Sequence, residues 1–434
     1  MHAFQADRAL KEEAGVAGLS WNRVLRMTVV ISLRTLALAL LCTLLGAAAP
    51  LSAASTETVL YSFQKGAHGQ SPNGGLVRDA KGNFYGTTSE GGLLHNNCGS
   101  SGCGTVFKVT PAGVETVLYS FTGTNGDGNI PGSGLMLDAN GNLYGTTVAG
   151  GNGGHGTVFE VAPNGAETVL YKFTGRSDGA TPDAGLMRDA KGNLYGTTLG
   201  GGLKSQGAVF ELTPAGSENA LFSFNGPDGA SPRSTLIQAG GNFYGTASGG
   251  GGSSACASGC GVVFELSSNA TETVLHVFTG GADGARPVGS LVQDAQGNLF
   301  GTATNGGRLN KACPTGCGTV YKLSPSPGGT WTFTVLHKFT GEGDGYYPAG
   351  GVVMDANGNL YGLTGGNTCW GNTCAGSLYE ISAAGTETIL YKFKGKADGQ
   401  FPAGSLVLDD KGNLYGTTYA GGANGYGTVF KVTP

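Results

Sequence analysis

The strongest constraint on the fold is a block of residues that recurs seven times between Glu57 and Pro434. Each copy carries an E-T-V-L-Y-S-F run, a D-G-x-x-P loop, a G-L-V-R-D-A run, the sequence G-N-L-Y-G-T-T, a glycine-rich loop and a G-T-V-F-K-V-T-P run. The aromatic residue of the Y-G-T-T element recurs every 49 to 61 residues, at Tyr85, Tyr144, Tyr195, Tyr244, Phe300, Tyr361 and Tyr415. Because the copies fill the chain after residue 54, no room remains for a second domain.

Each copy contains four short β-rich runs bounded by Gly, Asn, Asp and Pro, a pattern typical of strands. Four strands in a repeat of about 50 residues indicate one blade of a propeller. The V-L-Y-S-F and T-V-F-K-V runs are apolar at nearly every position, so both faces of each sheet must be covered, as they are between stacked blades. Glycine supplies 82 of the 434 residues, which argues against helices because an interior glycine costs about 1 kcal/mol. We therefore predict an all-β, seven-bladed β-propeller with four antiparallel strands per blade.

The order of the runs predicts how the ring closes. If G-L-V-R-D-A is the innermost strand, the first run, 57–63, becomes the outermost strand of the last blade and pairs with 427–434. Such pairing would remove the open edges of a repeat array. The D-A-K-G-N and T-P-A-G turns are short and nearly constant, so they predict hairpins on one rim. The longer D-G-x-x-P and glycine-rich loops then share the opposite rim, where we expect function to reside.

Residues 1–54 have the features of a secretory signal peptide. Arg23, Arg26 and Arg34 precede an apolar run over 36–49, and small residues follow, which is the order of a signal peptide. The apolar run is shorter than the roughly 20 residues of a membrane span. Translation could start at Met1 or at Met27. We predict a mature propeller over 55–434 without a transmembrane segment, exported to the periplasm or the extracellular space, and we expect a monomer.

Charge and repetition limit the partners. With 25 Lys and Arg against 29 Asp and Glu, the chain offers no basic patch for a phosphate backbone, which argues against nucleic acid. The repeated aspartate of the D-G turn is predicted to bond its own loop rather than calcium, because each loop offers a single carboxylate. It occurs at Asp127, Asp178, Asp228, Asp283, Asp344 and Asp398. We predict no cofactor and no metal. His276 and His337, which replace a strand tyrosine, are predicted to be structural.

The cysteines predict disulfides. Without Cys42, eight cysteines remain, all in glycine-rich loops, as the local pairs Cys98 with Cys103, Cys256 with Cys260, Cys313 with Cys317, and Cys369 with Cys374. An even number, local pairing and export favour four short disulfides. Zinc is the competing interpretation, but it needs four ligands around one ion, whereas these pairs lie in different blades.

Departures from the repeat are the candidate functional residues. Six aromatic residues gather in the variable loops of the last two blades: Tyr346, Tyr347, Trp370, Phe401, Tyr419 and Tyr426. Aromatic side chains on stiff loops suit stacking on sugars or anchoring a protein, which predicts a ligand-binding patch. The alternative is that they pack on one another and fill the loop interiors.

Histidines form a second, weaker candidate set. His68 occupies the place of the repeated aspartate, while His95 and His155 lie in glycine-rich loops, with Glu90 nearby. A histidine with a carboxylate could act as an acid/base pair or as half of a metal site. No G-x-S-x-G nucleophile motif accompanies them, so solvated loop histidines remain the simpler interpretation.

The blocks resemble the GloVer tandem repeat carried by "choice-of-anchor" proteins. The motif is exemplified by Asp189, Gly192, Asn193, Leu194, Tyr195, Gly196 and Thr197, and the resemblance covers Glu57 to Pro434. It implies export and often an anchoring segment. Since nothing follows Pro434 here, release is expected rather than anchoring. The resemblance supplies no catalytic residues. The D-x-x-G-N-L-Y core is more distantly similar to NHL and lactonase-like propellers.

Together these patterns predict an exported, non-catalytic binding or scaffold module, with carbohydrate or an envelope protein as partner. Two alternatives stay open. One is a propeller hydrolase or lyase acting at the channel mouth, and the other is a purely structural ring.

Overall fold

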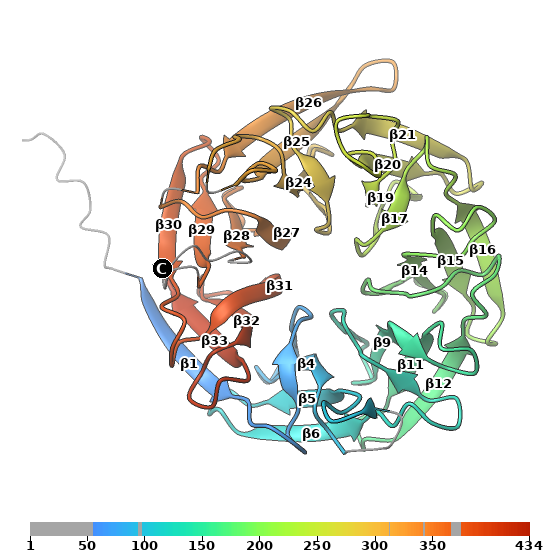
Figure 1. Ribbon diagram of the computed structural model, residues 1–434, viewed down its shortest axis with the longest axis vertical. Coiled ribbons are helices and arrows are strands. Elements are labelled where there is room, and N and C mark those ends of the chain that lie inside the picture. The colour runs from blue at the N-terminus through green and yellow to red at the C-terminus, as the bar shows by residue number, and fades with distance from the viewer. Residues whose placement is uncertain (1–54, 94–97, 312, 342, 366–374) are drawn as a thin grey trace, which may run out of the picture. The chain divides into compact units, whose positions relative to one another are not determined.

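Seven antiparallel sheets stand in a ring and form a seven-bladed β-propeller (Figure 1). The computed structural model describes residues 55–434 except 94–97, 312, 342 and 366–374. Over this described part every regular element is a strand, and no helix there has the length and hydropathy needed to cross a membrane. The predicted fold class is confirmed.

Each blade is built from the four predicted runs, from the centre of the ring outward. The second strands are β4 (Phe84–Glu90), β9 (Leu143–Thr147), β14 (Leu194–Thr198), β19 (Asn242–Gly249), β24 (Leu299–Asn305), β28 (Leu360–Thr364) and β32 (Leu414–Ala420). The third strands are β5 (Thr105–Val109), β11 (Thr157–Val161), β15 (Ala208–Leu212), β20 (Val262–Leu266), β25 (Thr319–Ser326), β29 (Ser377–Ile381) and β33 (Thr428–Thr433). The outer strands are β6 (Glu115–Ser120), β12 (Glu167–Lys172), β16 (Glu218–Ser223), β21 (Glu272–Val277), β26 (Thr330–Lys338), β30 (Glu387–Lys392) and β1 (Thr56–Ser62).

The innermost strand is less regular than predicted. It is a single strand in the last two blades, β27 (Pro348–Met354) and β31 (Gln400–Leu408), and only β13 (Met187–Arg188) in the third. In the other four it is split into two short strands. These are β2 (Gln70–Pro72) with β3 (Val77–Arg78), β7 (Gly128–Asn129) with β8 (Met136–Leu137), β17 (Ala230–Pro232) with β18 (Ile237–Ala239), and β22 (Ala285–Pro287) with β23 (Val292–Gln293). In the second blade β7 pairs with β10 (Ala149–Gly150). The first piece ends at the proline of the D-G-x-x-P loop, or two residues before it in the case of β7, and proline interrupts the ladder because it lacks an N–H donor.

The two ends of the propeller unit seal the ring in the last blade. Strand β1 pairs antiparallel with β33, from Thr56 opposite Thr433 to Ser62 opposite Thr428, and the two lie side by side in Figure 1. The Phe63 N–H extends the ladder by donating to the Gly427 carbonyl at 2.9 Å. The predicted closure is thus confirmed, with the strand bounds shifted by a residue.

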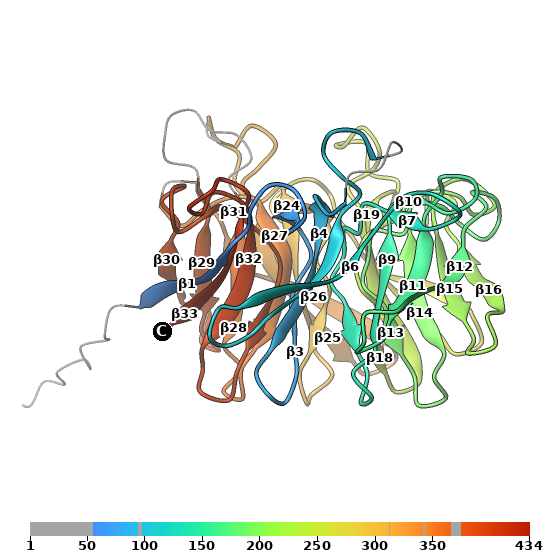
Figure 2. The ribbon, with the colours of Figure 1, turned by 90° about the horizontal axis from the view of Figure 1, so that it is seen from below.

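The two rims differ as predicted. Figure 2 shows the loops around β7 and β10 on one side of the ring and the turns beside β3, β13 and β18 on the other. The D-G-x-x-P loop and the glycine-rich loop of a blade are bonded together, for example by the Gly92 N–H donating to the Gly66 carbonyl at 2.9 Å. We call the rim that carries these two loop families the loop rim.

The core consists of seven hydrophobic clusters. The cluster that contains Phe121 joins the first and second blades, where its ring meets Phe159 edge-to-face with centroids 5.0 Å apart. The glycine of Y-G-T-T makes this packing possible. A Cβ on Gly145 would lie 2.6 Å from the Phe159 ring, so only glycine fits. The prediction that the repeated aromatic residues form the core between blades is confirmed.

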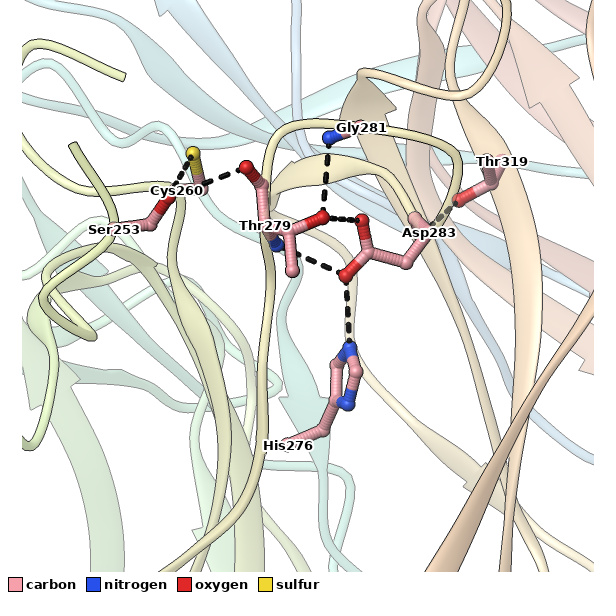
Figure 3. A network of polar contacts seen from close by, with 7 residues as sticks. All are labelled: Ser253, Cys260, His276, Thr279, Gly281, Asp283 and Thr319. Carbon is pink, nitrogen blue, oxygen red and sulfur yellow. Dashed lines mark hydrogen bonds and ion pairs between the residues drawn. The ribbon is translucent and has the colours of Figure 1, made fainter. Parts of the chain in front are cut away.

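The repeated aspartate hydrogen-bonds within its own loop and to the outer strand, as predicted for a turn residue. Figure 3 shows Asp283 accepting hydrogen bonds from Thr279 and lying 3.3 Å from His276 Nε2. His276 in turn stacks on Phe333 with centroids 3.7 Å apart. Elsewhere a strand tyrosine takes the histidine's place, as when the Tyr119 hydroxyl donates to Asp127 at 3.1 Å. The aspartate is therefore a turn residue that ties the loop to the outer strand.

Candidate functional site

One backbone position on the loop rim recurs in all seven blades and is strained in each. It is the residue before the proline of the D-G-x-x-P loop, and its φ lies between 52° and 58°. We call these seven the crown residues: Ser71, Ile130, Thr181, Ser231, Arg286, Tyr347 and Phe401. They make up seven of the ten non-glycine residues with positive φ in the described part of the chain. A β-branched or bulky residue in this region is an outlier that usually has a functional reason.

Contacts with the preceding blade force the crown conformation. Each crown N–H donates to a carbonyl of that blade's glycine-rich loop, at 2.7 to 3.0 Å. The crown carbonyl accepts from its own blade, as when Val148 N–H donates to Ile130 at 3.0 Å. The following proline packs on a glycine of the preceding blade, and a Cβ on Gly104 would lie 2.6 Å from Pro131 Cδ. The backbone is therefore fixed on both sides, whatever side chain the crown residue carries.

The disulfides hold some of these carbonyls in place. The structure contains Cys98–Cys103, Cys256–Cys260 and Cys313–Cys317, as predicted, whereas Cys369 and Cys374 lie outside the described residues. The second cysteine of each bridge supplies the carbonyl that the next crown residue binds: Cys103 to Ile130, Cys260 to Arg286, and Cys317 to Tyr347. Disulfides are typical of proteins that fold outside the cytosol. The bridges therefore indicate export and stiffen the site.

Three of the predicted aromatic residues share one cavity. Tyr347, Phe401 and Tyr419 line a cavity of about 770 Å³ at the loop rim, formed by residues of the fourth to seventh blades together with Asn73 of the first. Tyr419 is 38 % exposed. The Tyr347 hydroxyl lies 3.4 Å from Thr315 Oγ1, inside the loop closed by Cys313–Cys317. We call this cavity the mouth cavity.

The mouth cavity carries basic but no acidic side chains. Among the residues that the structure describes, the only charged ones in its lining are Arg233 and Arg286, both exposed. Asn73, Thr304, Asn305 and Thr315 add neutral polar groups to its wall. Sequence reasoning missed the two arginines, because it selected the loop positions by aromatic character alone. Arg286 stands directly before a proline, as Tyr347 and Phe401 do, so its position was the available signal.

A second, narrower cavity lies at the centre of the ring. Inner segments of all seven blades line its volume of about 320 Å³, mostly with glycine and serine. Asp183 and Arg233 are the charged residues of this central cavity, with Asp183 Oδ2 3.1 Å from Arg233 Nη2. Burial raises the pKa of the Asp183 carboxyl, although the Arg233 guanidinium favours its charged form. Arg233 lines both cavities and so links them.

The remaining predicted aromatic residues lie elsewhere. Tyr346 packs against the cluster of Phe339 and Tyr379, and its ring meets Tyr347 edge-on at 5.2 Å. Tyr426 packs against the cluster that contains Phe63. These two rings are half-buried against core clusters, and a role for them in ligand binding stays a prediction. Trp370 lies outside the described residues.

The histidine set is dispersed. His68 Nδ1 lies 3.0 Å from Glu115 Oε2 across the seam between the last and first blades. Glu90 instead accepts from Gln70 Nε2 at 2.7 Å, and the His155 ring covers Gly175. His95 lies outside the described residues. Among the described residues no hydrogen bond or ion pair joins these side chains to one another, and no cluster of three or more metal-ligating side chains occurs.

Known proteins share the repeat and the fold. The family model of the Gloeobacter/Verrucomicrobia repeat matches residues 46–258, 191–372 and 309–434. A search of curated proteins finds no match. The extracellular domain of a one-component system from B. thetaiotaomicron superposes with a TM-score of 0.50 at 9 % identity, over 85 % of this chain and 39 % of that one. This chain thus spans well under half of that protein.

Two further structures align less closely. A protein named as a gluconolactonase has a TM-score of 0.38 at 15 % identity, over 64 % of this chain and 80 % of that one. A luciferin-regenerating enzyme has a TM-score of 0.43 at 11 % identity, over 87 % of this chain and 96 % of that one. Identities this low carry no activity or substrate to the present chain.

Proposed function

The chain belongs to the Gloeobacter/Verrucomicrobia repeat family, and we propose that this member is an exported, non-catalytic module that binds carbohydrate in the mouth cavity. The aromatic side chains of Tyr347, Phe401 and Tyr419 would stack on sugar rings, and the neutral amides and hydroxyls would bond their hydroxyl groups. Export rests on the disulfides and on the predicted signal peptide over 1–54.

The crown carries the proposal. Glycine would adopt its backbone conformation without steric cost, and this chain places glycine at many neighbouring left-handed positions, including Gly104. At the crown it instead keeps seven side chains of different size and chemistry, each at a cost of about 1 to 2 kcal/mol. Such strain persists where the side chain serves a purpose other than folding. Tyr347 and Phe401 are neighbours on this ring and face the same cavity.

The test is retention on a panel of immobilised polysaccharides, followed by calorimetric titration with oligosaccharides of whichever glycan is retained. The variants Tyr347→Ser and Phe401→Ser install the residue that the chain itself carries at Ser71 and Ser231, so the backbone strain is unchanged. Each is expected to weaken binding at least tenfold, since losing one stacked ring costs about 1.4 kcal/mol. Thr181→Ser also introduces serine at a crown residue, but it lies on the opposite side of the crown and removes no ring. It should leave affinity unchanged.

Other results would overturn the proposal. Unchanged retention in both aromatic variants would remove the mouth cavity as the site. An envelope protein that binds in place of every glycan, with the same dependence on Tyr347, would replace carbohydrate by protein. Release of shortened sugars from a bound glycan, abolished in Tyr347→Ser, would make the protein a hydrolase or lyase.

A further inference from the structure

We infer that the carbohydrate is acidic and that its carboxylate groups, as in a hexuronate polymer, bind Arg286 and Arg233. This inference rests on the proposed function and narrows its ligand class. It starts from the charge of the mouth cavity, whose lining contains two guanidinium groups and no carboxylate. The whole chain has more acidic than basic residues, 29 against 25, so the cavity differs in sign from the protein that surrounds it.

The backbone of Arg286 is fixed by a hydrogen bond, whereas its guanidinium group has no ion-pair partner among the described residues. It is a crown residue with φ of 55°, and its N–H donates to the Cys260 carbonyl at 2.7 Å. Its side chain is exposed and forms no ion pair with any residue that the structure describes. No other crown residue is charged. Without an ion-pair partner among the described residues, the guanidinium group of this strained arginine does not stabilise the fold. It would be able to bind an anionic ligand.

Arg233 lies one blade earlier, directly after Pro232 and so two residues beyond the crown residue Ser231. Asp183 Oδ2 holds its Nη2 at 3.1 Å from the adjoining blade. The pair leaves the remaining guanidinium N–H groups available, because arginine has five donors in a fixed plane. It also offsets the charge of Asp183 in the adjoining central cavity, which would otherwise repel an anion. The geometry therefore places two guanidinium groups beside the three aromatic rings.

This combination matches a sugar acid better than other anions. A planar carboxylate accepts two parallel N–H bonds from a guanidinium group, while the pyranose ring beside it offers an apolar face for stacking on Tyr347, Phe401 or Tyr419. The neutral lining of Asn and Thr side chains supplies partners for hydroxyl groups. An acidic peptide would satisfy the arginines but would leave this aromatic and hydroxyl-binding surface without a matching chemistry.

The experiment compares one polymer in two charge states. The full-length secreted protein is titrated with galacturonate oligomers and alginate oligomers, and then with the same oligomers after methyl esterification of their carboxylates. Sulfated galactan oligomers and poly-glutamate serve as further anions. We expect a uronate to bind, with affinity reduced at least tenfold by esterification and at least tenfold by Arg286→Ser. Arg286→Lys should recover only part of the loss, because lysine cannot bind a carboxylate in a bidentate manner.

Each remaining outcome refutes a defined part of the argument. Binding of neutral or esterified oligomers with unchanged affinity in Arg286→Ser would overturn the acidic ligand while leaving the carbohydrate-binding function intact. A preference for sulfated galactan over both uronates would overturn the carboxylate. Binding of poly-glutamate alone would overturn the sugar. Binding of no glycan at all would overturn the proposed function itself. Thermal unfolding of Arg286→Ser should match wild type, since the Arg286 side chain forms no ion pair with a residue that the structure describes, and this measurement excludes misfolding.

Discussion

Lowering the pH from about 8 to about 5 should stabilise this propeller, because its seams bury pairs of carboxyl groups. A glutamate at the start of an outer strand lies beside the loop aspartate of the preceding blade, as Glu167 does beside Asp127. Burial, reinforced by the aspartate's charge, raises the pKa of Glu57, Glu167, Glu218 and Glu272 to about 7. In each of them Oε1 is buried without a hydrogen-bond partner. The seams therefore favour the protonated glutamate.

The sign and size of the pH effect on stability follow from these pKa shifts. Because the folded pKa exceeds the unfolded value, the stabilisation is complete below about pH 4.5 and is lost as the pH rises through about 7. An increase from 4.5 to about 7 corresponds to at most about 3.4 kcal/mol per group. Since these side chains are only half-buried, solvent screening reduces this to about 1 kcal/mol each. Four groups then give about 4 kcal/mol, or about 4 to 8 °C in Tm.

The loop aspartates limit the stability at low pH. Burial by itself would raise the pKa of Asp178, but hydrogen bonds from Thr174 and Tyr171 hold it below its usual value. Stability from such a group is present at neutral pH and is lost as the pH falls below about 3.8. We therefore expect a maximum of Tm between about pH 4 and pH 5, measured by calorimetry across the pH range.

A matched pair of variants isolates the seam. Glu167→Gln should raise Tm at pH 8 by about 1 to 3 °C and flatten the pH profile, because it removes a charge that the seam disfavours. Glu115→Gln is the control, since His68 replaces the aspartate at that seam and its Nδ1 lies 3.0 Å from Glu115 Oε2. This variant should instead lower Tm. A wild-type Tm that declines steadily from pH 8 to pH 5, or a less stable Glu167→Gln at pH 8, would refute the reasoning.

Four further predictions concern the scaffold. The Tyr379 hydroxyl is buried without a partner where five blades have phenylalanine, so Tyr379→Phe should add about 1 to 2 kcal/mol to the unfolding free energy in urea. Gly104→Ala should remove more than about 3 kcal/mol, because its Cβ would lie 2.3 Å from the Thr88 carbonyl, whereas Gly154→Ala, with nothing within 4 Å, should cost only about 1 kcal/mol. Deleting 55–63 should expose the edge of β33 and produce association on size-exclusion chromatography, in contrast to the full chain. Replacing both Cys313 and Cys317 by serine should lower Tm only slightly but weaken glycan binding, because the Cys317 carbonyl accepts the Tyr347 N–H bond. A large loss of stability together with the loss of binding would contradict a positioning role for this disulfide.

The sequence predicted the blades and their closure because both depend on which residue types occupy the strands and turns. Strand periodicity, turn residues and the position of the first run follow from local preferences repeated seven times. The crown conformation could not be predicted, because serine, isoleucine and arginine carry no preference for positive φ. It arises from bonds to the preceding blade, which are distant in sequence. Tyr346 and Tyr347 illustrate the consequence, since Tyr346 packs against a core cluster while Tyr347 lines the mouth cavity.

The repeat also explains how a near-symmetric scaffold acquires an asymmetric site. Each crown backbone is fixed by two neighbouring blades, so a side chain there can change without altering a strand, a turn or a core cluster. The fifth to seventh blades use this freedom for Arg286, Tyr347 and Phe401. Of the four crown residues on the remaining arc, Ser71, Thr181 and Ser231 are small and polar and Ile130 is aliphatic. Because neither arginine nor serine is β-branched, exchanging one for the other at a crown position changes the backbone strain little. Exchanging Arg286 with Ser231 in a double variant should therefore move the ligand's preferred position while leaving Tm within about 2 °C, and a large loss of stability would show that the crown side chains belong to the fold after all.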